Sequence, residues 1–136
     1  MARCAAALLG TAILVAAVDL AHKAGADATS IHDRSAIYVV LVCGLSVVWA
    51  AGILLTRSPT LGFGGGVVLG GAVGNVVSLA VWSGVPDPLD AGAIAFNLAD
   101  VFVLAGFVLV AAATLALVAR DPERLREPVR VRRAEP

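Results

Sequence analysis

Four long apolar stretches, separated by short polar segments, dominate the pattern of this chain. They cover residues 2–21, 36–56, 61–82 and 95–119. A helix needs about 20 predominantly apolar residues to cross the hydrocarbon core of a bilayer, so each stretch has the length of a transmembrane helix. The pattern therefore predicts an all-α integral membrane protein with four transmembrane helices.

The segments between these stretches contain residues that stop helices. Residues 57–60 read Arg-Ser-Pro-Thr, and residues 83–88 contain one glycine and two prolines. Such clusters mark turns between regular elements. The four helices are therefore expected to form two hairpins in one membrane domain, residues 1–119, followed by a basic tail, residues 120–136.

Composition supports this assignment. Hydrophobic residues make up 60% of the chain and charged residues 15%, and the mean hydropathy is +0.93. These values exclude an ordinary soluble domain of this length.

The basic residues predict the orientation, although the formal net charge is zero. Six of the ten basic residues are arginines within residues 120–133, and Arg3 and Arg57 fall on the same side of the membrane. Lys23 and Arg34 fall on the other side. Because basic residues near helix ends are retained in the cytoplasm, both termini are predicted to be cytoplasmic. The tail is expected to bind anionic membrane lipid, with no role in nucleic-acid binding.

Two aspartates, at the edges of the last two apolar stretches, are the candidate catalytic residues. Asp87 follows the third stretch and Asp100 lies near the start of the fourth, so a hairpin between them brings both to the same depth. Ionisable groups within apolar sequence are costly and mark functional sites by default. Two neighbouring carboxylates cannot both ionise easily, so one holds a proton while the other acts as a base. That pair can drive attack of water on an amide, and we expect no metal or organic cofactor.

Two short motifs resemble a known family. Residues 96–100 read Phe-Asn-Leu-Ala-Asp and match completely the Phe-Asn-x-Ala-Asp motif of the signal peptidase II family, intramembrane aspartic peptidases that cut signal peptides from bacterial prolipoproteins. Residues 74–79 are similar to the family's Gly-Asn-x-x-Asp-Arg motif, whose acid precedes the first catalytic aspartate by nine residues. Nine residues after Ser78 is Asp87. The resemblance therefore implies that Asp87 and Asp100 are catalytic and that Asn75 and Asn97 contact substrate.

Two weaker blocks extend the resemblance to about residues 19–106. Residues 19–23 are similar to the family's Asp-x-x-Thr-Lys motif, and residues 33–38 to its Asn-x-Gly-Ala-Ala-Phe motif. This implies substrate-binding roles for Asp19 and Lys23. It also implies a bacterial plasma-membrane location, a prolipoprotein substrate with a diacylglyceryl cysteine, and a small β-element in the outer loops.

The chain also departs from the family pattern. Ser78 and Leu79 replace the Asp-Arg pair, which removes an expected ion pair. Because Val76, Val77 and Leu79 are apolar, we expect the surroundings of Ser78 to be repacked with apolar groups. The outer loops are also shorter than in typical members. A catalytically impaired paralogue that binds lipoprotein or lipid is therefore an alternative function, and a small transporter half is a weaker one.

Structural roles remain open for the same residues. Asp87 and Asp100 could be helix caps or turn residues, and Asn75 and Asn97 could join helices by hydrogen bonds. The glycines of residues 62–66 and 70–74 lack the Lys-Ser/Thr of a phosphate loop. Close helix packing explains them better.

Overall fold

The structure, a computed structural model, describes residues 1–28 and 30–120 and contains four long helices. These are α1 (Ala2–Gly25), α2 (Ala36–Thr56), α3 (Pro59–Trp82) and α4 (Leu98–Arg120). All four are long and apolar enough to cross a membrane, which confirms the predicted fold class. Apart from Arg120, the predicted basic tail lies outside the described residues.

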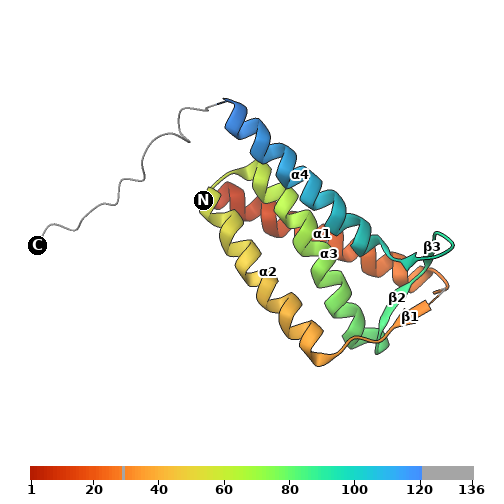
Figure 1. Cartoon of the computed structure of the whole chain (residues 1–136). Coiled ribbons are helices and arrows are strands. Elements are labelled where there is room, and N and C mark those ends of the chain that lie inside the picture. Colours follow the sequence, from red (N-terminus) through yellow and green to blue (C-terminus); the bar gives the residue numbers. More distant parts are fainter. Residues whose placement is uncertain (29, 121–136) are drawn as a thin grey trace, which may run out of the picture.

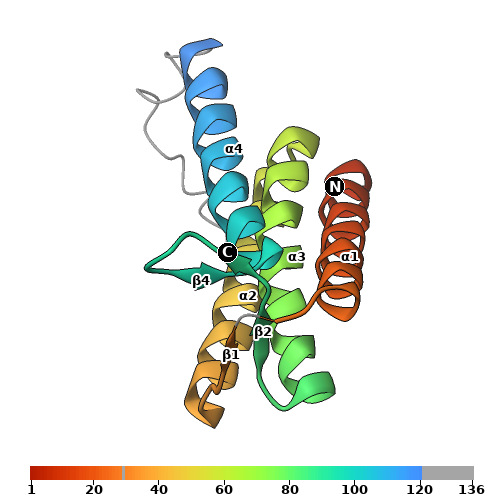
Figure 2. The same cartoon turned by 90° about the vertical axis from the view of Figure 1, so that its right-hand side faces the viewer.

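Successive helices alternate in direction, so the bundle has two distinct ends (Figure 1). The start of α1, the turn between α2 and α3, and the last residues of α4 lie at one end. The short strands lie at the other end, which we call the strand end. Figure 2 shows α3 between α1 and α4, and α3 contacts each of the other three helices. Much of the core therefore forms around α3.

Glycines bring α1 and α3 into direct backbone contact. Every fourth residue along one face of α3 is a glycine: Gly62, Gly66, Gly70 and Gly74. A Cβ atom added to Gly66 would lie 2.5 Å from the Leu8 carbonyl oxygen, and one added to Gly70 would lie 2.6 Å from that of Ala12. Small residues let membrane helices approach this closely. The interpretation of the glycines as packing residues is confirmed.

The α2–α3 turn forms where the polar cluster of residues 57–60 predicts it. Arg57 ends α2 in the left-handed conformation, with φ of 56°, and its N–H donates to the Leu54 carbonyl. Ser58 then caps α3 by accepting a hydrogen bond from the Leu61 N–H. Pro59 occupies the first turn, where its missing N–H costs nothing. Helix α3 therefore begins two residues before the predicted start at residue 61.

Four short strands at the strand end form two antiparallel pairs. Strand β1 (Ser30–His32) pairs with β2 (Val85–Asp87), and β3 (Leu89–Asp90) pairs with β4 (Ala95–Phe96). The small β-element expected in the outer loops is thus present. Its pairing also corrects the predicted start of the last helix at residue 95, because residues 95 and 96 pair with β3 and α4 begins at Leu98. Helix α1 also continues to Gly25, beyond its predicted end at residue 21.

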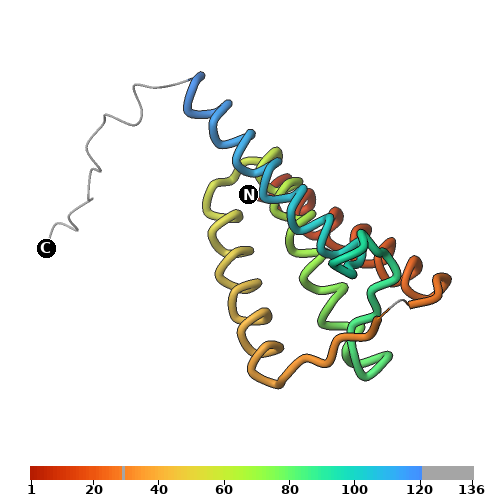
Figure 3. The backbone as a smooth tube through the Cα atoms, turned by 45° about the vertical axis from the view of Figure 1, so that its right-hand side comes forward, coloured from red at the N-terminus to blue at the C-terminus, as the bar shows by residue number. Residues whose placement is uncertain are grey.

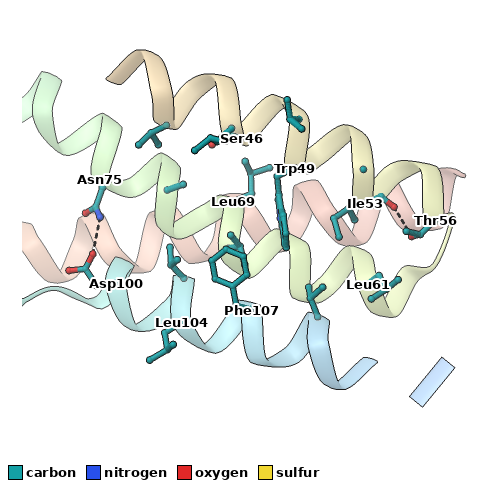
Figure 4. A pocket seen from close by; sticks show the side chains of 18 of the residues that line it. Ser46, Trp49, Ile53, Thr56, Leu61, Leu69, Asn75, Asp100, Leu104 and Phe107 are labelled. Atoms are coloured by element: carbon teal, nitrogen blue, oxygen red, sulfur yellow. Dashed lines mark hydrogen bonds between the residues drawn. The ribbon is translucent and has the colours of Figure 1, made fainter. Parts of the chain in front are cut away.

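A largely apolar groove runs between α2, α3 and α4. Figure 3 shows α2 set apart from the other helices along much of its length. The space enclosed is about 790 Å³. Trp49 and Phe107 face one another within it, with ring centroids 5.2 Å apart. Asn75 and Asp100 lie at one end of the groove (Figure 4).

Candidate active site

Asp87 is the last residue of β2, and both of its carboxylate oxygens have a hydrogen-bond partner. The residue is only 3% exposed. The Asn97 side chain donates from Nδ2 to Asp87 Oδ1 over 2.5 Å. The Nδ1 atom of His32, in β1, lies 2.5 Å from Asp87 Oδ2. The carboxylate is therefore fixed between β1 and the residue that precedes α4.

Asp100, in the first turn of α4, lies at the surface of the groove and forms a capping box with Asn97. The Asp100 N–H donates to Asn97 Oδ1, and the Asn97 N–H donates to Asp100 Oδ2, each over 3.2 Å. This reciprocal pair satisfies two backbone donors at the helix start. A helix-capping role for Asp100 is therefore correct, but Asp100 Oδ1 also accepts from Asn75 Nδ2 over 3.2 Å.

Asn97 consequently links the two aspartates. Its Nδ2 contacts Asp87, while its Oδ1 and its backbone N–H contact Asp100. Asn97 itself is 1% exposed. The structure thus brings Asp87 and Asp100 into contact with one buried residue, and Asp100 lies at the end of the groove.

Asp19 and Lys23 form a buried ion pair behind this site. Lys23 Nζ donates to Asp19 Oδ2 over 2.7 Å, to Asn75 Oδ1 over 2.8 Å and to Ser78 Oγ over 3.1 Å. An ammonium group has three donors, and all three are used. The other Asp19 oxygen accepts from the Ala99 N–H over 2.9 Å, so the pair connects α1 with α3 and α4.

The surroundings of Ser78 are polar, which makes the prediction of apolar repacking wrong. Ser78 is fully buried; it accepts from Lys23 and donates to the Gly74 carbonyl over 2.7 Å. Neighbouring valines in the sequence gave a false indication because they point to other sides of the helix. The Asp19 carboxylate alone neutralises the Lys23 ammonium. The neutral hydroxyl of Ser78 therefore adds no net charge to this buried site.

Asn75 connects the buried ion pair to the groove. Its Oδ1 accepts from Lys23, and its Nδ2 donates to Asp100. The Lys23 contact also determines the orientation of the amide, since only the oxygen can accept from an ammonium. A continuous series of hydrogen bonds therefore runs from Asp19 through Lys23 and Asn75 to Asp100.

Comparison with known protein families shows to which family this chain belongs. The model of the signal peptidase (SPase) II family matches residues 15–116, most of the chain. The chain belongs to the signal peptidase II family. Members are aspartic endopeptidases, and membership implies cleavage of lipoprotein signal peptides. Comparison with curated proteins gives no match. The chain is accordingly a multi-pass membrane protein of the signal peptidase II family.

In this member of the signal peptidase II family, the site residues lie together at the strand end. All six that were predicted from the sequence are among them. Asp87, Asp100, Asn75 and Asn97 share direct contacts, whereas Asp19 and Lys23 are buried behind Asn75. Sequence reasoning missed His32, which contacts Asp87. The histidine directly precedes the block of residues 33–38, but nothing local in the sequence reveals the strand pairing that brings it to Asp87.

Proposed function

We propose that Asp87 and Asp100 are the catalytic pair of this peptidase. The observation that carries the proposal is that Asn97 donates to both carboxyl groups, to Asp87 from its side-chain amide and to Asp100 from its backbone N–H, and that Asp100 lines the end of an apolar groove. One buried residue that donates to both carboxyl groups holds them in fixed relative positions. Such pre-organisation is what acid–base catalysis by a carboxyl pair requires.

The proposed reaction uses water and both carboxyl groups. One aspartate takes a proton from water as the water attacks the peptide carbonyl before the lipid-modified cysteine. The other aspartate, protonated, donates a hydrogen bond to that carbonyl and stabilises the charge that develops on its oxygen. Asp100 lies in the groove lining, so the scissile bond approaches the pair from that side.

The groove is suited to an apolar helical segment. Its lining consists mainly of leucine, valine and aromatic side chains from α2, α3 and α4. We propose that the signal peptide of a prolipoprotein lies there, with its diacylglyceryl cysteine beside Asp100. An apolar substrate segment that moves from the lipid into this groove stays in apolar surroundings. Asn75 and Asp100 supply polar contacts where the chain is cut.

The other predicted residues are assigned distinct parts in substrate binding. Asn97 and Asn75 border the two aspartates directly and are proposed to contact the substrate backbone around the scissile bond. Asp19 and Lys23 are proposed to act on the substrate through Asn75, because Lys23 determines the orientation of its amide. We further propose the bacterial plasma membrane as the location, with both termini in the cytoplasm and the strand end outside.

Cleavage of a lipidated prolipoprotein by the purified full-length protein tests this function. The expected product is the lipid-bearing mature protein, separated from its signal peptide on a gel and identified by mass spectrometry. Binding of the prolipoprotein without cleavage, under conditions in which another signal peptidase II cleaves it, would instead support the impaired paralogue. The same substrate without its diacylglyceryl group serves as the matched control and should be cleaved poorly.

A further inference from the structure

His32 contacts Asp87 because of the register between β1 and β2. His32 lies opposite Val85 in this antiparallel pair, and Asp87 is two residues further along β2. Side chains two residues apart on a strand share a face, and diagonal neighbours across a pair lie within reach of long side chains. Figure 2 shows β1 and β2 side by side. A shift of one residue in the register would turn His32 away from Asp87.

The contact differs from an ordinary stabilising ion pair. The Asp87 side chain is 4% exposed, but that of His32 is 47% exposed. A half-exposed histidine contributes little to stability through burial, and exposed ion pairs contribute little as well. Strand β1 is held on β2 by its backbone pairing in addition. The contribution of His32 to the fold is therefore small, whereas its effect on the position of the Asp87 carboxyl is direct.

We propose that His32 is a positioning residue for Asp87, an assignment that rests on the proposed function of Asp87. In the tautomer that carries a proton on Nδ1, His32 donates to Asp87 Oδ2, while Asn97 donates to Oδ1. The two donors come from different parts of the chain, β1 and the residue before α4, and each holds one oxygen of the carboxyl group. Loss of the His32 donor would remove a contact that holds Oδ2 and would shift the carboxyl relative to the reacting water.

Placement of His32 depends on how the segment between β1 and α2 is anchored. Ser35 caps α2 by accepting from the Tyr38 N–H over 3.3 Å. Arg34 lies over the Tyr38 ring, with 5.2 Å between the guanidinium carbon and the ring centroid. Tyr38 lines the groove. The segment that carries His32 is therefore connected to the groove wall, and its docking on β2 aligns Asp87.

Steady-state cleavage of a lipidated prolipoprotein by full-length variants tests the assignment. The variant His32→Ala should lower kcat by about 10- to 100-fold, because small misplacements of reacting groups have effects of this size, with KM nearly unchanged. His32→Asn should restore most of kcat, since its amide nitrogen occupies nearly the position of Nδ1. The matched control is Ile31→Ala, on the opposite face of β1 and exposed, which should retain the wild-type kcat.

Several results would overturn the proposal. Wild-type kcat in His32→Ala would show that the contact has no catalytic effect. Equal losses in His32→Ala and Ile31→Ala would show that only the strand matters, and a loss in His32→Asn as large as in His32→Ala would exclude the hydrogen bond as the cause.

A measurement without catalysis separates this assignment from the proposed function. The chain has two histidines, so the imidazole ¹⁵N signals of His32 are assigned by comparison with His32→Asn. The substitution Asp87→Asn should shift the His32 Nδ1 signal and leave that of His22 in place. Unchanged His32 signals would refute the positioning role even in an inactive protein. Absence of cleavage by the wild type, with the shift present, would refute the proposed function alone.

Discussion

Asn97 donates to Asp87 over 2.5 Å from the same side chain that caps Asp100. The residue spacing makes this possible, because an asparagine at the N-cap and an aspartate three residues later satisfy one another's backbone N–H groups. The cap uses the Asn97 oxygen and leaves its amide nitrogen to reach Asp87. A local helix-capping motif therefore also organises the candidate catalytic pair.

The first prediction concerns the two carboxyl groups. Asp87→Asn and Asp100→Asn should each reduce cleavage of a lipidated prolipoprotein by about 100-fold or more, since each removes one partner of the proposed acid–base chemistry. The matched control is Asp90→Asn, which keeps the oxygen that accepts from the Gly92 N–H in the β3–β4 turn and should cleave like the wild type. Full turnover by Asp87→Asn would show that counting nine residues from Ser78 identified the wrong aspartate.

The second prediction concerns the buried ion pair. Lys23→Met should lower the free energy of unfolding by about 3–5 kcal/mol, because Asp19 is left as an uncompensated buried charge. The double variant Asp19→Asn with Lys23→Met should be more stable than Lys23→Met alone, since the amide oxygen introduced at position 19 can still accept from the Ala99 N–H. Unfolding in detergent, followed by circular dichroism, measures both. Equal losses in the single and double variants would contradict the charge argument.

The third prediction concerns the position of the family's acid. Ser78→Asp should lower the thermal midpoint, because a second carboxylate would share the single Lys23 ammonium with Asp19 in a fully buried site. Ser78→Ala, the control, adds no charge; it removes the hydroxyl that accepts from Lys23 and donates to the Gly74 carbonyl, and should cost about 1.5–3 kcal/mol. A higher midpoint for Ser78→Asp would indicate that the pocket has room for the acid found in the family motif.

The fourth prediction concerns the glycine face of α3. Gly66→Ala should destabilise the bundle by about 1–3 kcal/mol, because its Cβ would lie 2.5 Å from the Leu8 carbonyl oxygen and force α1 away. Gly10→Ala, in α1, is the matched control, since no atom lies within 4 Å of its added Cβ. It should be neutral or stabilising by about 0.5–1 kcal/mol. Similar thermal midpoints for the two variants would argue against close α1–α3 contact.

The fifth prediction concerns orientation. Arg3, Arg57 and Arg120 all lie at the end of the bundle opposite the strands (Figure 1), so that end should face the cytoplasm. A reporter fused after Pro136 should be cytoplasmic, and one inserted beside Asp90 should be outside. A fusion after Pro136 that reports an external location would put Asp87 and Asp100 on the wrong side for exported lipoproteins.

The apolar stretches determined the helices by themselves, because the length and hydropathy needed to cross a bilayer are local properties of a sequence. Their boundaries shifted for local and for tertiary reasons: the cap at Ser58 starts α3 two residues early, and the pairing of β3 with residues 95 and 96 delays the start of α4. The complete match of residues 96–100 likewise predicted Asp100 and Asn97 as candidate site residues without a structure.

Only the tertiary structure decided what surrounds these residues. Lys23 and Ser78 are far apart in the sequence, and the glycine pattern predicts close packing of α3 without showing that α1 is its partner. The contact of His32 with Asp87 depends on the register of two three-residue strands, which are too short to leave a periodic signal. Spacing along a helix is encoded locally, but contacts between elements arise from packing of the whole bundle.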